Sequence, residues 1–119
     1  MAWSFTQDKA VYLQIAERIT ILILSGKYAP SEQIPSVRQL AFEAAVNPNT
    51  VQHAFSELEN QNIIVSKGTL GRFVTDDTTV IEKCRKSLAE KYAAEFITKV
   101  SALSLTKDEL ISIIKESEL

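Results

Sequence analysis

Two short helical segments joined by only two residues constrain the fold of this sequence more than any other feature. Ser36 and Gln39 stand at the S-x-x-Q spacing of a capping box, which predicts a helix from there through Ala45. Asn47 is a preferred N-cap residue for the next helix. Only Val46 and Asn47 remain for the turn, and so short a connection forces the two helices to cross steeply. The pair therefore predicts a helix-turn-helix.

The residues after this turn predict one more helix and a hairpin. Pro48 takes the first helical position, where a missing N–H costs nothing, and the helix is expected to reach about Gln61. Its buried stripe is predicted to be Val51, Phe55 and Leu58. Two β-rich runs, residues 63–65 and 73–74, then flank residues 67–72, whose glycines allow a hairpin turn.

A helix is also predicted before the turn, from Ala10 to Ser25, with Gly26 as its C-terminal glycine. Its apolar face is Val11, Ile15, Ile19 and Leu22. A second apolar group, Ile21, Ile23 and Leu24, leaves a strand as the alternative for its end. We expect this group to contact the C-terminal helices, so that Ile23→Glu would uncouple the two halves of the chain without unfolding the hairpin. Helix, helix, helix and hairpin is the order of a winged helix.

The C-terminal part predicts two helices and an unpartnered apolar face. Thr79 with Glu82, and Thr106 with Glu109, have capping-box spacing, and a short final helix covers residues 110–114. Between the two caps runs one continuous stripe: Ile81, Cys84, Leu88, Tyr92, Phe96, Val100 and Leu103. Two helices cannot bury that much apolar surface on each other, since stable small bundles need three or four. We therefore expect a second copy of the chain to cover the stripe.

These patterns together predict a mainly α fold with a small β-hairpin wing (α+β). We expect residues 1–75 to form a winged helix-turn-helix domain, a class that binds DNA, and residues 76–119 to form a two-helix dimerisation tail with a possible effector role.

Composition excludes several classes of function. One cysteine, Cys84, and one histidine, His53, cannot supply a structural zinc site, so no metal is expected. The longest apolar run, residues 21–24, is far too short for a membrane helix, and residues 1–9 do not form a signal peptide, so a cytoplasmic protein is expected. No P-loop, nucleophile elbow or glycine-rich nucleotide turn is present. We expect neither an enzyme nor a cofactor.

The start of the second helix of the helix-turn-helix has the chemistry of a DNA-reading segment. It reads Asn47, Pro48, Asn49, Thr50, Val51, Gln52 and His53. Side chains at a helix start project forward with free backbone N–H groups, which suits phosphate binding and base reading. Asn47, Asn49 and Gln52 can each pair with the adenine edge in the major groove, and Thr50 suits a phosphate. The alternatives are that Asn47 only caps the helix, Asn49 only serves the turn and Gln52 is only solvated.

Cations flank this segment, although the net charge does not favour DNA. Arg38 lies away from the apolar side of its helix, where it can hold a phosphate or reach guanine; the alternative is a surface ion pair with an acid such as Glu43. Lys67 and Arg72 flank the hairpin tip, where cations can follow the minor groove or be simply solvated. Residues 1–75 carry six basic and six acidic side chains, so binding should involve few phosphate contacts.

Five spaced motifs within residues 10–75 resemble the GntR-type winged-helix transcription regulators. They are VYLQIA at 11–16, LSG at 24–26, IPSVRQLA at 34–41, VNPNTV at 46–51 and FV at 73–74. The short tail resembles the YtrA-like subgroup. The resemblance implies DNA contacts from Ser36, Arg38, Asn47, Asn49, Thr50, Gln52, Lys67 and Gly68.

The sequence departs from the pattern of this family at several positions. Gln52 stands where the family usually has arginine, which leaves the operator sequence open. Ser31 and Asn62 replace usual glycines, Ala10 replaces a common proline, and two residues separate Gly68 from Gly71 where one is usual.

The function expected is a homodimeric repressor that binds an inverted-repeat operator, with half-site centres about 10 bp or a multiple apart. A small-molecule effector of unknown identity could act on the spacing of the two heads. The alternative is a winged-helix module that binds another protein and not DNA.

Overall fold

The computed structural model of the chain describes residues 2–119, and its contacts divide the chain into two units. The first, here called the head, extends to Cys84, and the second, the tail, spans Arg85–Leu119. This boundary lies later than the predicted one after residue 75, because the first turns of a long helix pack on the head. Within residues 2–119 no helix combines the length and apolarity needed to cross a bilayer.

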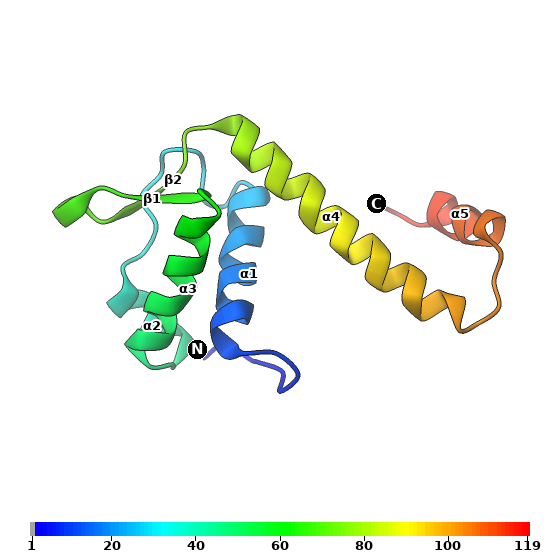
Figure 1. Cartoon of the computed structure of the whole chain (residues 1–119), viewed down its shortest axis with the longest axis horizontal. Coiled ribbons are helices and arrows are strands. Elements are labelled where there is room, and N and C mark those ends of the chain that lie inside the picture. Colours follow the sequence, from blue (N-terminus) through cyan, green and yellow to red (C-terminus); the bar gives the residue numbers. More distant parts are fainter. Residues whose placement is uncertain (1) are drawn as a thin grey trace. The chain divides into compact units, whose positions relative to one another are not determined.

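Three helices form the body of the head: α1 (Val11–Leu24), α2 (Val37–Ala44) and α3 (Pro48–Asn60) (Figure 1). Both predicted caps are confirmed. Ser36 and Gln39 form a reciprocal capping box at α2, and the Asn47 side chain accepts a hydrogen bond from the N–H of Asn49 at α3. α1 is helical to its end, so the strand alternative there is wrong.

Several turns of the head use residues with positive φ. Gly26 follows α1 with φ 85°, as predicted for a C-terminal glycine. Ala45 ends α2 with φ 58°, and Asn62 follows α3 with φ 61°. Ser31 has φ 68° in the loop between α1 and α2. Ser31 and Asn62, the two residues that replace usual glycines, thus adopt the left-handed conformation that glycine takes most readily.

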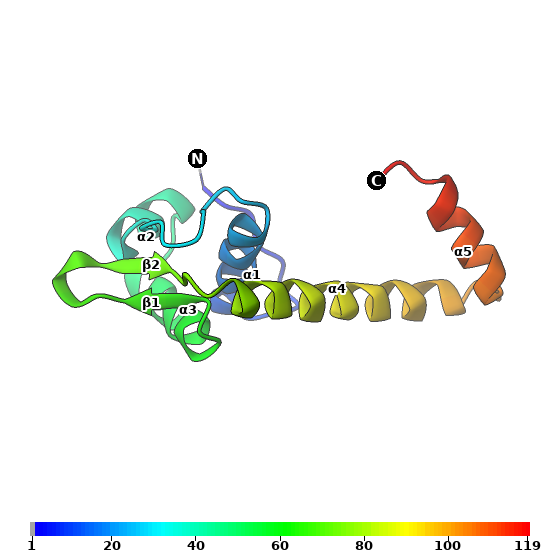
Figure 2. The same ribbon diagram turned by 90° about the horizontal axis from the view of Figure 1, so that it is seen from above.

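The wing is an antiparallel hairpin of β1 (Ile64–Ser66) and β2 (Arg72–Val74), joined by a 3₁₀ turn, η1 (Gly68–Leu70) (Figure 2). Residues 31–34 also pair with the free edge of β2, which the sequence did not predict. The N–H of Val74 donates to the carbonyl of Glu32 at 2.8 Å, and the N–H of Ile34 donates to the carbonyl of Arg72 at 3.0 Å. The loop before α2 is thereby part of the wing.

The core of the head lies between its helices and the wing. Its largest fully buried side chains are Phe55, Ile15, Ile19, Leu40, Leu58, Ile63, Ile64, Val51 and Val74. Ile23 and Ile81 belong to the same core, 3% and 6% exposed, and Cys84 packs against it. The sequence had placed Ile81 and Cys84 in the dimer stripe, whereas they help to anchor the long helix to the head.

The tail consists of the remainder of α4 (Thr78–Ser101), together with α5 (Lys107–Glu116). Thr106 and Glu109 form the predicted capping box of α5. The capping box predicted at Thr79 is wrong, because α4 begins at Thr78 and Thr79 lies inside the helix, where its N–H donates to the Asp77 carboxylate.

The predicted stripe also extends past the end of its helix. Leu103 lies beyond α4, in a turn where Ser104 has φ 59°, and is 66% exposed. Its side chain therefore does not continue the helical face that the sequence indicated.

The burial of Ile23 changes the expectation for Ile23→Glu. A carboxylate at this site would be desolvated in the core, so the head should lose about 3–5 kcal/mol of stability and unfold. Ile21→Glu is the matched control, since Ile21 is 43% exposed and should tolerate the same charge. Urea denaturation followed by circular dichroism measures both. Equal unfolding midpoints for the two variants would contradict the placement of Ile23 in the core.

Candidate nucleic-acid interface

The N-terminus of α3 presents a group of amide side chains to solvent. Asn47, Asn49 and Gln52 are all exposed, whereas Val51 and Phe55 on the same helix are fully buried. Asn47 uses its side-chain oxygen to accept the N–H of Asn49 at 2.8 Å, so its capping role is established by the geometry. Because Val51 and Phe55 fix the rotation of α3 in the core, the side chains of Asn49 and Gln52 are held toward solvent. The N–H₂ group of Asn47 is not used by its cap.

His53, at the end of the predicted reading segment, is held against α1. Its ring stacks on that of Tyr12, with centroids 3.5 Å apart and planes inclined by 8°. The contact joins the exposed side of α3 to α1. His53 therefore has a packing partner inside the head, in addition to any contact with a ligand.

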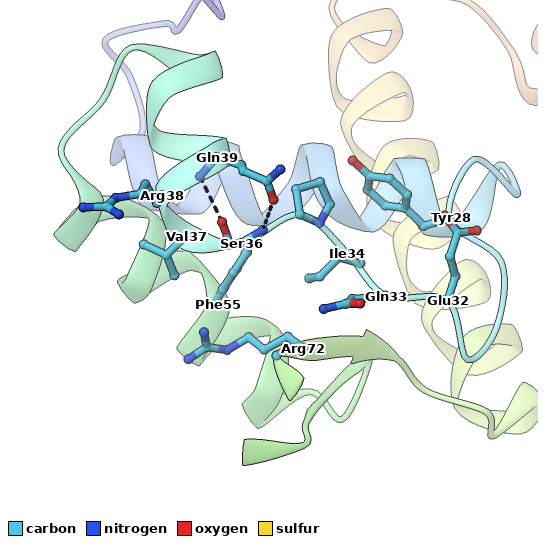
Figure 3. A pocket seen from close by; sticks show the side chains of 12 residues that line it. Tyr28, Glu32, Gln33, Ile34, Ser36, Val37, Arg38, Gln39, Phe55 and Arg72 are labelled. Atoms are coloured by element: carbon cyan, nitrogen blue, oxygen red, sulfur yellow. Dashed lines mark hydrogen bonds between the residues drawn. The ribbon is translucent and has the colours of Figure 1, made fainter. Parts of the chain in front are cut away.

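A hollow of about 650 Å³ lies between the start of α2 and the wing (Figure 3). Its wall includes Gln33, Ile34, Ser36, Arg38, Gly71 and Arg72. The Arg38 side chain is exposed and extends away from α2 (Figure 3). Within residues 2–119 Arg38 forms no ion pair with Glu43, so that alternative for Arg38 is not realised. Its guanidinium is available for a phosphate or for a base edge.

Two acids lie near this hollow and act on Tyr28, which also lines it. Burial raises the pKa of the Tyr28 phenol, and the negative charges of Glu43 and Glu32 raise it further. The phenol is therefore neutral at physiological pH. The same two acids weaken the positive potential around α2, consistent with the balanced charge of residues 1–75.

The two wing cations have different surroundings. The Lys67 ammonium lies over the Phe73 ring, 4.6 Å from its centroid. Arg72 donates to the Glu59 carboxylate at 3.2 Å and lies 5.0 Å from the centroid of Phe55. Arg72 thus ties the wing to α3, and it is less available to a ligand than the sequence suggested.

Gln33 is a residue of this surface that sequence reasoning missed. Its side-chain amide donates to the carbonyl of Leu70 in the wing turn at 2.7 Å. No local pattern marks Gln33, because the partner lies 37 residues away and the contact exists only once residues 31–34 pair with β2. Gly68 and Gly71 in the same turn have φ of 60° and 101°.

The predicted surface residues thus come from three places in the head. Ser36 and Arg38 lie at the start of α2; Asn47, Asn49, Thr50, Gln52 and His53 at the start of α3; and Lys67, Gly68 and Arg72 in the wing. Of the predicted dimerisation residues, Leu88, Tyr92, Phe96 and Val100 lie on the tail portion of α4.

Comparison with known proteins gives a consistent picture. The family described as "Bacterial regulatory proteins, gntR family" matches residues 11–74. The HTH-type transcriptional repressor YtrA of Bacillus subtilis is 38% identical over 60% of this chain and 57% of its own. A solved GntR family transcriptional regulator from Listeria monocytogenes has a TM-score of 0.88 and 34% identity, covering 96% of this chain and 100% of that one.

Several similar structures are complexes with operator DNA. The DNA-binding domain of AraR, solved in complex with operator ORX1, has a TM-score of 0.55 and 26% identity to this chain. The match covers 63% of this chain and 92% of that domain. The winged head is therefore similar to a domain that has been seen bound to an operator.

Two substitutions at Asn47 test whether its cap stabilises α3. Asn47→Ala removes the acceptor for the Asn49 N–H and should cost about 1 kcal/mol of stability. Asn47→Ser keeps a hydroxyl acceptor, so its stability should stay within about 0.5 kcal/mol of the parent chain. Thermal unfolding measures both. A Ser variant as unstable as the Ala variant would show that the hydrogen bond to Asn49 does not stabilise α3.

Proposed function

The chain belongs to the GntR family of bacterial regulatory proteins, and from that premise we propose that it is a cytoplasmic repressor that binds an inverted-repeat operator as a homodimer. The observation that carries the proposal is the exposure of Asn47, Asn49 and Gln52 at the start of α3 together with that of Arg38 at the start of α2, which forms no ion pair within residues 2–119. In a helix-turn-helix these two helix starts face the major groove and the adjoining backbone.

In this proposal α3 reads bases and α2 holds the backbone. Asn49 and Gln52 present both a donor and an acceptor, which matches the adenine edge in the major groove. Thr50, which is half-buried at the helix start, suits a phosphate oxygen. Arg38 and the hydroxyl of Ser36 lie at the N-terminus of α2, where the helix dipole also favours an anion.

The wing supplies the remaining contacts. Lys67 and Gly68 stand at the start of its turn, and Gly68 allows the backbone to approach DNA closely. Arg72 supports this surface through Glu59. Few cations are therefore assigned to phosphates, and specificity depends more on base contacts than on charge.

We propose dimerisation because the apolar side chains of the tail are not buried within a single chain. In the single chain, every side chain from Arg85 to Leu119 is exposed or half-buried. Leu88, Tyr92, Phe96 and Val100 recur at steps of four along α4, with Tyr92 39% and Phe96 37% exposed. A helical unit without buried residues does not stabilise itself in water, whereas a second copy would bury this face.

A twofold dimer implies a twofold operator. The two reading helices would enter half-sites whose centres are about 10 bp or a multiple apart. An effector, if one exists, would act by binding one spacing of the two heads better than another. The repressor role is supported by the similarity to YtrA, which carries that name.

The first test is a gel-shift titration of the full chain on DNA from its own upstream promoter. Arg38→Ala should weaken binding about tenfold to a hundredfold, because each protomer loses a charge-assisted hydrogen bond. Lys115→Ala removes the same charge from α5 and should leave affinity within about twofold of the parent chain. The slope of log affinity against log salt should be no steeper than about −5, as for about six phosphates per dimer.

Two outcomes would contradict this proposal. Equal affinities for the Arg38→Ala and Lys115→Ala variants would remove Arg38 from the interface. No binding to any promoter fragment or random-sequence pool would instead favour a module that binds protein, the function for which the balanced charge of the head is better suited.

The second test concerns the tail. Phe96→Glu places a carboxylate in the proposed seam and should shift the chain from dimer to monomer at micromolar concentration, because the charge would be desolvated. Ala94→Glu introduces the same charge on the opposite side of α4 and should leave the dimer intact. Sedimentation equilibrium measures both. A monomeric parent chain, or a Phe96→Glu dimer as tight as the parent, would refute this seam.

A further inference from the structure

We propose that Leu70, at the apex of the wing, enters the minor groove of the operator as an apolar contact that disfavours G·C pairs, and that Gln33 positions it there. The inference rests on the proposed function and assigns a specificity-determining residue to it. Leu70 is 67% exposed in this turn, so its side chain is accessible to a ligand that meets the wing.

The apex has no charged side chain that reaches forward from it. The turn consists of Gly68, Thr69 and Leu70, all exposed. The nearest cation, Lys67, lies over the Phe73 ring at 4.6 Å, and Arg72 is bound to Glu59. Lys67 and Thr69 remain able to contact the sugar-phosphate backbone beside the tip, and Leu70 is the exposed apolar side chain of the turn.

The backbone of this apex is held in place. The N–H of Leu70 donates to the carbonyl of Lys67 at 3.1 Å, and the N–H of Lys67 donates to the carbonyl of Gly71 at 2.8 Å. From outside the turn, the side-chain amide of Gln33 donates to the Leu70 carbonyl at 2.7 Å. Leu70 is thus presented by a turn that is fastened on both sides, so its side chain can be inserted without first ordering a loop.

Gly71 makes this arrangement possible. A Cβ at Gly71 would lie 2.9 Å from the Gln33 amide nitrogen, and the residue has φ 101°. Without a side chain, Gly71 leaves room for the Gln33 amide that donates to the Leu70 carbonyl. Gln33 and Gly71 together fix the direction of the tip.

The minor groove suits an apolar tip of this size. Its walls are sugar C–H groups, and several minor-groove-binding proteins insert leucine or similar apolar side chains there. At A·T pairs its floor holds only acceptors, whereas G·C pairs add the protruding guanine amino group. A leucine cannot accept a hydrogen bond from that group, so Leu70 should favour A·T over G·C where it lies.

The experiment uses a duplex selected from a random-sequence pool by the full chain. Each A·T pair flanking a half-site is replaced by G·C or by I·C, since inosine lacks the amino group but keeps the major-groove edge of guanine. At the wing position, the parent chain should lose about tenfold in affinity with G·C and less than about twofold with I·C. Leu70→Ala should bind the A·T duplex about tenfold more weakly and lose the discrimination.

Two further variants complete the design. Leu13→Ala makes the same substitution at a residue 40% exposed on α1 and should keep both affinity and discrimination. Gln33→Ala keeps the Leu70 side chain but removes the hydrogen bond that holds the Leu70 carbonyl. The ratio of A·T to G·C affinity should therefore fall, while the unfolding temperature changes little. That ratio reports positioning, because a general loss of stability would not alter it.

Each other result overturns the inference in a recognisable way. A parent chain that binds no DNA refutes the proposed function itself. A parent chain that binds DNA but responds equally to G·C and I·C, or a Leu70→Ala variant that binds like the parent, refutes the role of Leu70 alone. A Leu70→Ala variant with unchanged DNA binding and an altered oligomeric state would assign the residue to a contact between proteins.

Discussion

The burial of one face of α3 is the constraint on which the rest of the head depends. Val51, Ala54, Phe55 and Leu58 are all fully buried, so the helix has a single rotational setting against α1. Residues between these positions in the helical cycle, such as Asn49 and Gln52, are then directed outward. The wing is tied to the same helix through Glu59 and Arg72, which makes the position of the hairpin a consequence of the same packing.

Local features of this fold were predictable from sequence, and non-local ones were not. The caps at Ser36 and Asn47 use partners two or three residues away, so spacing alone reveals them. Asp77 shows the limit of this reasoning, because Asp77 and Thr79 are both good caps and the sequence does not say which begins the helix. The capping carboxylate also lowers its own pKa by accepting hydrogen bonds from Thr79.

Contacts between distant segments escaped prediction for a different reason. Periodicity predicts that Ile23 and Ile81 lie on apolar faces of their helices. It does not show whether those faces are buried in the core of the head or against the tail or a second chain, and the structure places both residues in the core of the head. No hydrophobic pattern in the sequence indicates that residues 31–34 pair with β2. The hydrogen bond from Gln33 to Leu70 depends on that pairing, so it could not be predicted either. The structure leaves the predicted residues at the starts of α2 and α3 accessible, and their contacts with DNA stay a prediction. The contacts of Gln33, Lys67 and Arg72 within the wing could be found only from coordinates.

Three helix ends of this chain use a residue with a side chain where glycine would fit the backbone better: Ala45, Asn62 and Ser104. A left-handed residue with a Cβ is strained by about 1–3 kcal/mol, whereas replacing glycine stabilises the fold through the unfolded chain by only about 0.4–1 kcal/mol. With only three glycines in 119 residues, the denatured ensemble is correspondingly restricted. At these three positions the strain of the native backbone exceeds what the restricted unfolded chain contributes, so the helix ends lower the stability of the fold that they terminate.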